Sequence, residues 1–284
     1  LTVRPRSQSQ LAWLDEDEMT FDVVMRLEDS DSTERMLASE TLGELAPTTL
    51  AQHDDAVVAR LDDSRGRVRK EALVTLRKLE PATLAQYADV VIARLEDSEE
   101  DVRVEALVAL GQLEPATLAQ YAAVVIARLE DSEEDVRSTA LETLQKLIFS
   151  NLYLEPAVLA PAVLAQHANA IVARLEDSHE DVRRMALETL GELEPATLAQ
   201  HAEAFAQHAD AFVAMLEDSN KWVRRAALKT LGQLVPATLA QHADAVAARL
   251  EDDEGKVRKA AWETLDKLEP ATLAQHAGVL LSLI

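Results

Sequence analysis

The chain has no cysteine, and its 284 residues include only seven glycines, three tryptophans, three tyrosines and four phenylalanines. Without cysteine there is no disulfide scaffold, no thiolate zinc site and no thiol nucleophile. The few glycines form neither G-x-G-x-x-G nor G-x-x-x-x-G-K-[ST], which excludes the common nucleotide-binding loops. We expect an intracellular protein, and the lack of cysteine fits the cytosol and an organelle, including a plastid, equally well.

Basic residues are also scarce, because 28 lysines and arginines stand against 51 acidic residues and give a net charge of −23. Such a charge disfavours a general affinity for nucleic acid or for anionic membranes. The uncharged stretch Pro156–Ala173 is long enough to be considered as a membrane span. Because it contains Pro161, His167 and Asn169, we expect a helix outside the membrane, no membrane insertion and no nucleic-acid partner.

What the chain has in abundance is repetition. The tetrad Leu-Glu-Asp-Ser, or a close variant, returns mostly every 34 residues, and Pro-Ala-Thr-Leu-Ala-Gln marks a second position of the same unit. Regular recurrence of this kind indicates one supersecondary unit per repeat. The tetrads begin at Leu27, Leu61, Leu95, Leu129, Leu175, Leu216 and Leu250.

Each unit is predicted to contain two helices. The first, for example Pro81–Glu96, opens with a proline at its first position, where the missing N–H costs nothing. The second, for example Glu99–Leu113, follows Ser98, which we expect to be the N-cap in a capping-box-like pair with Asp101. Its apolar residues recur at helical spacing, and no segment alternates as a strand does. The same serine–aspartate pairing stands at Ser132 with Asp135 and at Ser178 with Asp181.

These patterns predict an all-α, right-handed α-solenoid of seven helix pairs and a terminal helix. Residues 1–20 are expected to form an N-terminal tail and cap, and residues 21–284 the solenoid. Extra residues in two units keep the helical phase: Ile148–Leu154 are expected to prolong the preceding helix, and His201–His208 to lengthen a first helix. Pro161 is expected to kink a helix. The uncharged C-terminal end suggests either truncation of a longer array or coverage by another subunit. The units lie near 21–45, 46–79, 80–113, 114–154, 155–193, 194–234 and 235–268, and the terminal helix at 270–284.

An aspartate in each unit is followed six residues later by an arginine. Such an aspartate can accept backbone N–H bonds at a tight turn and can also meet an arginine of its own or the neighbouring unit, which would build a ladder of ion pairs. The pattern resembles HEAT repeats, and the short unit is similar to the compact HEAT-like repeats of bilin lyases. The resemblance implies that these residues hold the inter-helix turns together. The pairs are Asp29 and Arg35, Asp63 and Arg69, Asp97 and Arg103, Asp131 and Arg137, Asp177 and Arg183, Asp218 and Arg224, and Asp252 and Arg258.

Positions that vary between units, while the core positions do not, are expected to face solvent. One such position of the second helix is charged in five units but apolar at Val74 and Val108, with Val104 one helical turn away. An apolar patch on a charged face is a candidate contact surface. Basic residues gather in two bands that could receive acidic segments, one with Arg65, Arg67 and Lys70 and the other with Arg225 and Lys229.

Histidine or tyrosine takes one position of the first helix in all seven later units. A position shared by these two residue types favours a half-buried packing site over a metal ligand. HEAT-type deoxyhypusine hydroxylases hold iron with several His-Glu dipeptides, whereas this chain has the single dipeptide His179-Glu180. We therefore expect no metal, no cofactor and no catalytic residue. The shared position is occupied by His53, Tyr87, Tyr121, His167, His201, His242 and His276.

The sequence favours a non-catalytic protein-binding scaffold or adaptor, because a repeat array offers an extended surface to other proteins. Two alternatives remain open. One is a permanent structural subunit of a larger complex. The other, which follows from the resemblance, is a bilin-lyase-like enzyme or a chromophore-binding protein.

Overall fold

The computed structural model describes residues 16–149, 168–191 and 208–270, and every element in these ranges is helical. The chain divides into two compact units, Leu1–Val124 and Val125–Ile284. Within each unit, short helical segments alternate with longer second helices. The expected all-α class is therefore confirmed for the part of the chain that the structure describes. None of the helices in these ranges is long and apolar enough to cross a membrane.

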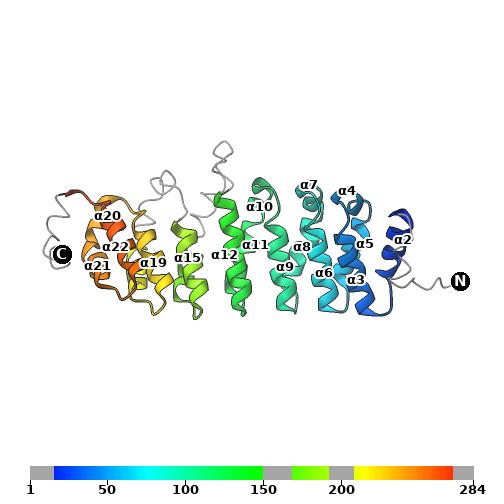
Figure 1. Cartoon of the computed structure of the whole chain (residues 1–284), viewed down its shortest axis with the longest axis horizontal. Coiled ribbons are helices and arrows are strands. Elements are labelled where there is room, and N and C mark those ends of the chain that lie inside the picture. Colours follow the sequence, from blue (N-terminus) through cyan, green and yellow to red (C-terminus); the bar gives the residue numbers. More distant parts are fainter. Residues whose placement is uncertain (1–15, 150–167, 192–207, 271–284) are drawn as a thin grey trace. The chain divides into compact units, whose positions relative to one another are not determined.

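In the first unit the second helices of successive repeats lie side by side. α3 packs against α6 and α6 against α9, while α5 and α8 pack on the second helix that follows each of them (Figure 1). The elements are α2 (Glu16–Arg26), α3 (Ser32–Gly43), α4 (Pro47–Leu50), α5 (Asp54–Val58), η1 (Ala59–Asp62), α6 (Gly66–Leu76), α7 (Pro81–Leu84), η2 (Ala85–Tyr87), α8 (Ala88–Ala93), η3 (Arg94–Glu96), α9 (Glu100–Leu110) and α10 (Pro115–Gln120), and the two units divide within α11 (Ala122–Ala127).

The second unit is built in the same way. α12 packs against α15, α15 against α19, and α19 against α22, so four second helices form one layer. The elements are η4 (Arg128–Glu130), α12 (Glu134–Phe149), α14 (Ala168–Val172), η6 (Ala173–Glu176), α15 (Glu180–Gly191), α18 (Ala209–Ala214), η7 (Met215–Glu217), α19 (Lys221–Leu231), α20 (Pro236–Gln241), α21 (Ala243–Ala248), η8 (Arg249–Glu251) and α22 (Gly255–Leu265).

The core consists of the periodic apolar residues of both helices. In α9, Val102, Ala106 and Leu107 are fully buried, and Phe212 of α18 is the largest fully buried side chain among the described residues. Because most of these residues are leucine, valine and alanine, the helices of successive repeats meet over many small contacts. The 3.6-residue periodicity of the sequence thus identifies the buried face correctly.

Where the structure describes a first helix from its proline onward, that helix is not continuous, contrary to the sequence prediction for Pro81–Glu96. It is divided into α7, η2, α8 and η3, and it bends at Tyr87, which has φ −104° and ψ 7°. These angles leave the α region and interrupt the helical hydrogen bonds. His53, Tyr121, His208 and His242 have similar angles, and all are half-buried. The position shared by histidine and tyrosine therefore marks a bend in the backbone.

The serine N-cap expected for the second helix is wrong. Glu99, not Ser98, is the N-cap of α9, and no side chain caps that helix. Instead Asp97 Oδ1 accepts a hydrogen bond from the Glu99 N–H at 3.0 Å, and Asp131 and Asp177 do the same for Glu133 and His179. An aspartate two residues before the N-cap closes this turn, because its carboxylate accepts from the second N–H beyond it.

Several expectations concern segments outside the described residues. They are the N-terminal tail and cap, the kink at Pro161, the lengthened helix around His201 and the terminal helix 270–284. α12 does extend to Phe149 and is longer than the other second helices, as the inserted residues led us to expect. The histidine that occupies the bend position before α19 is His208, in place of the predicted His201.

Candidate functional site

Within each unit, arginines of the second helices connect successive repeats through what we call the Arg–Asp ladder. Arg69 donates from Nε and Nη2 to the two carboxylate oxygens of Asp97 at 2.7 and 2.6 Å, and from Nη1 to the carbonyl of Asp63 at 2.8 Å. Each arginine thus binds its own turn through a backbone oxygen and the following turn through a carboxylate. The same bidentate contact joins Arg35 to Asp63, Arg137 to Asp177, Arg183 to Asp218, and Arg224 to Asp252.

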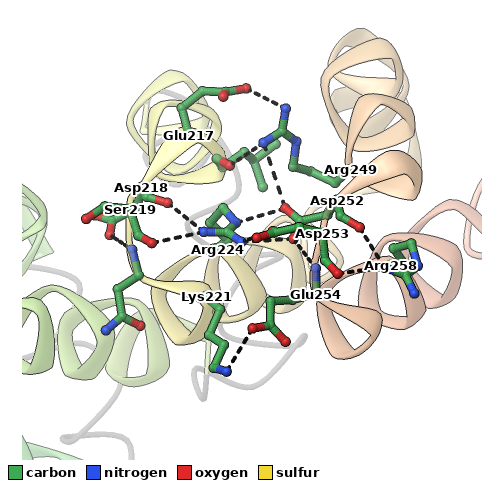
Figure 2. Close-up of polar contacts among 12 residues, drawn as sticks. Glu217, Asp218, Ser219, Lys221, Arg224, Arg249, Asp252, Asp253, Glu254 and Arg258 are labelled. Carbon is green, nitrogen blue, oxygen red and sulfur yellow. Dashed lines mark hydrogen bonds and ion pairs between the residues drawn. The ribbon is translucent and has the colours of Figure 1, made fainter.

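Arg224 shows how completely these groups are satisfied (Figure 2). Its guanidinium donates to Asp252 at 2.8 and 2.9 Å, to the exposed carboxylate of Asp253 at 2.9 Å, and to the carbonyls of Asp218 and Ser219. The Asp252 side chain is only 3% exposed. Bidentate, charge-assisted bonds of this kind are strong, and their fixed geometry sets the register between repeats.

The ladder changes the ionisation of its aspartates. Burial alone would raise the pKa of Asp252, but hydrogen bonds from Arg224 and from the Glu254 N–H outweigh burial and lower that pKa to about 2. The pKa values of Asp63, Asp97 and Asp177 are lowered by the same balance. All four carboxylates therefore stay charged at neutral pH, and they stabilise the fold without offering a proton for catalysis.

Two further sets of polar contacts between repeats were not anticipated from the sequence. Arginines of the first segments donate from Nη1 to a leucine carbonyl of the preceding repeat, as Arg94 does to Leu61 at 2.8 Å. Buried threonines of the second helices donate from Oγ1 to a backbone carbonyl of the preceding second helix, as Thr230 does to Leu187 at 2.9 Å. The sequence signals that could have indicated these contacts are the recurring dipeptides Arg-Leu and Thr-Leu. The other contacts of this kind join Arg60 to Leu27, Arg174 to Leu129, Arg249 to Leu216, Thr75 to Ser39, and Thr264 to Leu228.

The threonine contact has a matched test. We expect Thr230→Val to lower the free energy of unfolding by about 1 kcal/mol, because it removes a buried hydrogen bond between repeats while preserving shape. Thr41 occupies the same repeat position and donates only within its own helix, to Leu37 at 2.7 Å. In urea unfolding followed by circular dichroism, Thr41→Val should therefore cost clearly less. Equal losses in the two variants would show that the contact between repeats contributes nothing.

A groove of about 490 Å³ crosses the layer of second helices in the second unit. Its floor is made of small side chains, and Gly191 fits closely there because an added Cβ would stand 3.0 Å from Thr230 Oγ1. Charged side chains of both signs stand along it. The lining residues are Gln145 of α12, Glu188 and Gly191 of α15, Ala226, Lys229, Thr230 and Gln233 of α19 and the adjoining turn, and Ala260, Glu263, Thr264 and Lys267 of α22 and its end.

Comparison with known proteins agrees with this architecture. The family model for the sister chromatid cohesion protein PDS5 matches residues 149–283. A designed armadillo repeat protein, YIII(Dq)4CqI, superimposes with a TM-score of 0.51 at 18% identity, covering 75% of this chain and 98% of its own. Each unit is an α-solenoid of repeated helix pairs. An engineered protein at 15% identity gives a TM-score of 0.47 and covers 87% of this chain and 95% of its own. No curated protein sequence matches the chain.

The solenoid places the variable position of the second helix along the groove. Glu188, Lys229 and Glu263 hold that position in α15, α19 and α22, and all three line the groove. Val74 and Val108 hold it in α6 and α9 of the first unit, where they are half-buried, as Val104 is. They are less exposed than the residues of an open apolar patch would be.

The basic residues singled out from the sequence lie on the solenoid surface. Arg65 and Arg67 are exposed at the start of α6, whereas Lys70 forms an ion pair with Asp101 at 3.1 Å. Lys229 is exposed on the groove, and Arg225 lies 5.9 Å from the ring centroid of Trp222. Trp222 is 40% exposed and was missed, although Lys221-Trp222 stands where three units have Glu-Asp.

Proposed function

We propose that the chain is a non-catalytic scaffold that binds other proteins along its second helices. The observation that carries this proposal is the groove over α12, α15, α19 and α22. Its floor of glycine, alanine and threonine allows the backbone of an extended segment to approach closely. Its charged residues, Glu188, Lys229, Glu263 and Lys267, can select a partner by charge.

The polar groups between repeats have a different role from the residues that line the groove. The arginines and aspartates of the ladder are already bonded to one another, so they hold the repeats in register and leave little for a partner. The side chains that remain available are those of the variable position. A surface that repeats from helix to helix suits an extended partner, because each repeat adds a similar contact.

In the first unit the proposed contact is more apolar. Val74, Val104 and Val108 offer half-buried side chains at or beside the variable position, and the exposed Arg65 and Arg67, with Lys70, can steer acidic segments toward them. The match of residues 149–283 to the family of a sister chromatid cohesion protein falls on the groove-bearing unit and supports a role in protein assembly.

A charge exchange across the groove tests this proposal. We expect Lys229→Glu combined with Glu263→Lys to weaken ligands selected from a displayed peptide library by about tenfold or more, since the exchange places like charges opposite one another. Affinities would be measured by fluorescence anisotropy. The control exchange, Lys78→Glu with Asp89→Lys, alters exposed residues that do not line the groove and also preserves net charge. If the groove exchange left every selected ligand unaffected, the groove would not be the binding surface.

A further inference from the structure

Four side chains at the start of α19 and α22 form what we call the Trp222 cluster: Lys221, Trp222, Arg225 and Lys256. The Lys256 ammonium lies 4.9 Å from the ring centroid of Trp222, and the Arg225 guanidinium and Lys221 ammonium lie at 5.9 and 6.0 Å. Asn220 Oδ1 accepts a hydrogen bond from the Trp222 N–H at 2.8 Å and fixes the backbone beneath the ring. An exposed tryptophan surrounded by cations is thus held by two neighbouring repeats.

The positive charge of this cluster is only partly compensated. Lys221 forms an ion pair with Glu254 at 2.8 Å (Figure 2). Arg225 and Lys256 have no carboxylate within ion-pair distance among the described residues, although the chain as a whole carries a charge of −23. Their contact with the indole ring orients these two side chains and leaves their charges available.

The cations of the cluster stand at helix starts, as Arg67 does in α6, whereas three other second helices start with acidic residues. α9, α12 and α15 begin with Glu-Asp, which the positive end of the helix dipole favours. α19 begins instead with Lys221-Trp222, and Lys256 is the second residue of α22. Cations at a helix start oppose the dipole, so local helix stability does not account for them. A negatively charged ligand would account for these cations.

A hollow of about 310 Å³ lies beside the tryptophan. Trp222, Gly255 and Val257 supply its apolar lining, and Lys221, Arg225, Glu254 and Lys256 surround it. Gly255 leaves space there, since an added Cβ would meet only Arg258, at 3.5 Å. The hollow is large enough for one apolar side chain, with cations placed to meet charged groups on either side.

We propose that the Trp222 cluster docks an acidic linear segment of a partner protein, in which aspartates or glutamates flank one apolar side chain. The apolar side chain enters the hollow beside Trp222, and the flanking carboxylates pair with Arg225 and Lys256. This inference rests on the proposed scaffold function and adds a second contact with a defined partner chemistry. Charge complementarity selects a short acidic segment over nucleic acid, because the cluster is an isolated patch on a strongly acidic chain.

The test uses a short fluorescein-labelled peptide with one leucine between runs of aspartate and glutamate, titrated with the full chain in an anisotropy assay. Trp222→Ala, and separately Arg225→Ala with Lys256→Ala, should each weaken binding by about tenfold. Lys78→Ala with Lys259→Ala removes the same charge from exposed sites outside the hollow and should leave the affinity within about twofold. Replacing the peptide leucine by serine should also weaken binding, because the hollow then loses its apolar occupant.

Other outcomes would overturn the inference. Equal weakening by the cluster and control variants would reduce the effect to overall charge. Tighter binding of an oligothymidylate than of the peptide, lost in the same cluster variants, would assign the site to nucleic acid. Self-association in sedimentation that the cluster variants abolish would assign it to a second copy of the chain. If the peptide fails to bind while library ligands still depend on Lys229 and Glu263, this inference falls and the scaffold proposal stands.

Discussion

Arg224→Met is expected to lower the free energy of unfolding of the second unit by about 3 kcal/mol. The substitution keeps much of the side-chain volume but leaves the carboxylate of Asp252, which is 3% exposed, without its main partner. Removing one member of a buried ion pair is costly because the remaining charge has lost its water as well as its counterion. Urea unfolding followed by far-ultraviolet circular dichroism measures the difference.

Arg258 provides the matched control, because it holds the same repeat position in α22. It is exposed and donates to the carbonyls of Asp252 and Asp253, and no described carboxylate lies within ion-pair distance of it. Arg258→Met should therefore change stability by less than about 1 kcal/mol. If both variants lost the same stability, the carboxylate contact would contribute nothing and the ladder would not hold the repeats together.

Acid is expected to destabilise the solenoid steeply between about pH 4 and pH 2. The folded-state pKa values of Asp63, Asp97, Asp177 and Asp252 lie below their unfolded values, so the unfolded chain binds more protons in this range. Their contribution is complete above the unfolded pKa and disappears as pH falls through the folded one. For Asp252, whose pKa is about 2, the loss is about 2 kcal/mol. Glu71 acts in the opposite sense, because burial raises its pKa.

The acid effect can be assigned with single substitutions. Asp252→Asn removes the titrating group and should flatten the fall in stability between pH 4 and pH 2 while lowering stability at pH 7. The neighbouring Asp253 side chain is 85% exposed, so Asp253→Asn should leave the pH dependence nearly unchanged. Urea midpoints measured at a series of pH values provide the comparison. Identical pH profiles for Asp252→Asn and the unmodified chain would show that this carboxylate is not responsible.

The sequence predicts the helices well because periodicity and repetition report burial directly. Val102, Ala106 and Leu107 recur at helical spacing and are fully buried. It predicts the helix starts less well. Ser98 has the chemistry of an N-cap, yet Asp97 takes the turn, because its carboxylate can serve the Glu99 N–H and Arg69 at once. The local N-cap preference of serine is thus outweighed by a contact between Asp97 and an arginine of another repeat.

The bends of the first helices could not be predicted from local propensity. Tyr87 and His242 are not helix breakers, and the segments around them contain good helix formers. The backbone leaves the α region there in the folded chain, and the sequence signal was only that histidine and tyrosine alternate at one position. Similarly, the direction of the ladder, from each arginine to the next aspartate, depends on packing between repeats that spacing alone does not specify.

The candidate site was predicted in part. Variation between units identified the position that Glu188, Lys229 and Glu263 hold, and these residues line the groove. The prediction did not include the groove itself, because its depth comes from the small residues of four helices brought together. Trp222 was missed because its signal is a single departure, Lys221-Trp222 where three units have Glu-Asp, whereas recurrence identifies the positions that the units share.

Site-specific cross-linking tests the central claim most directly. Because the chain has no cysteine, Glu263→Cys carries a single benzophenone label on the groove, and Gln241→Cys carries one on the exposed end of α20. A binding partner selected on the unmodified chain, irradiated with each labelled variant, should cross-link efficiently to residue 263 and little to residue 241. The opposite pattern, or equal yields at both positions, would contradict the assignment of the second-helix groove as the protein-binding surface.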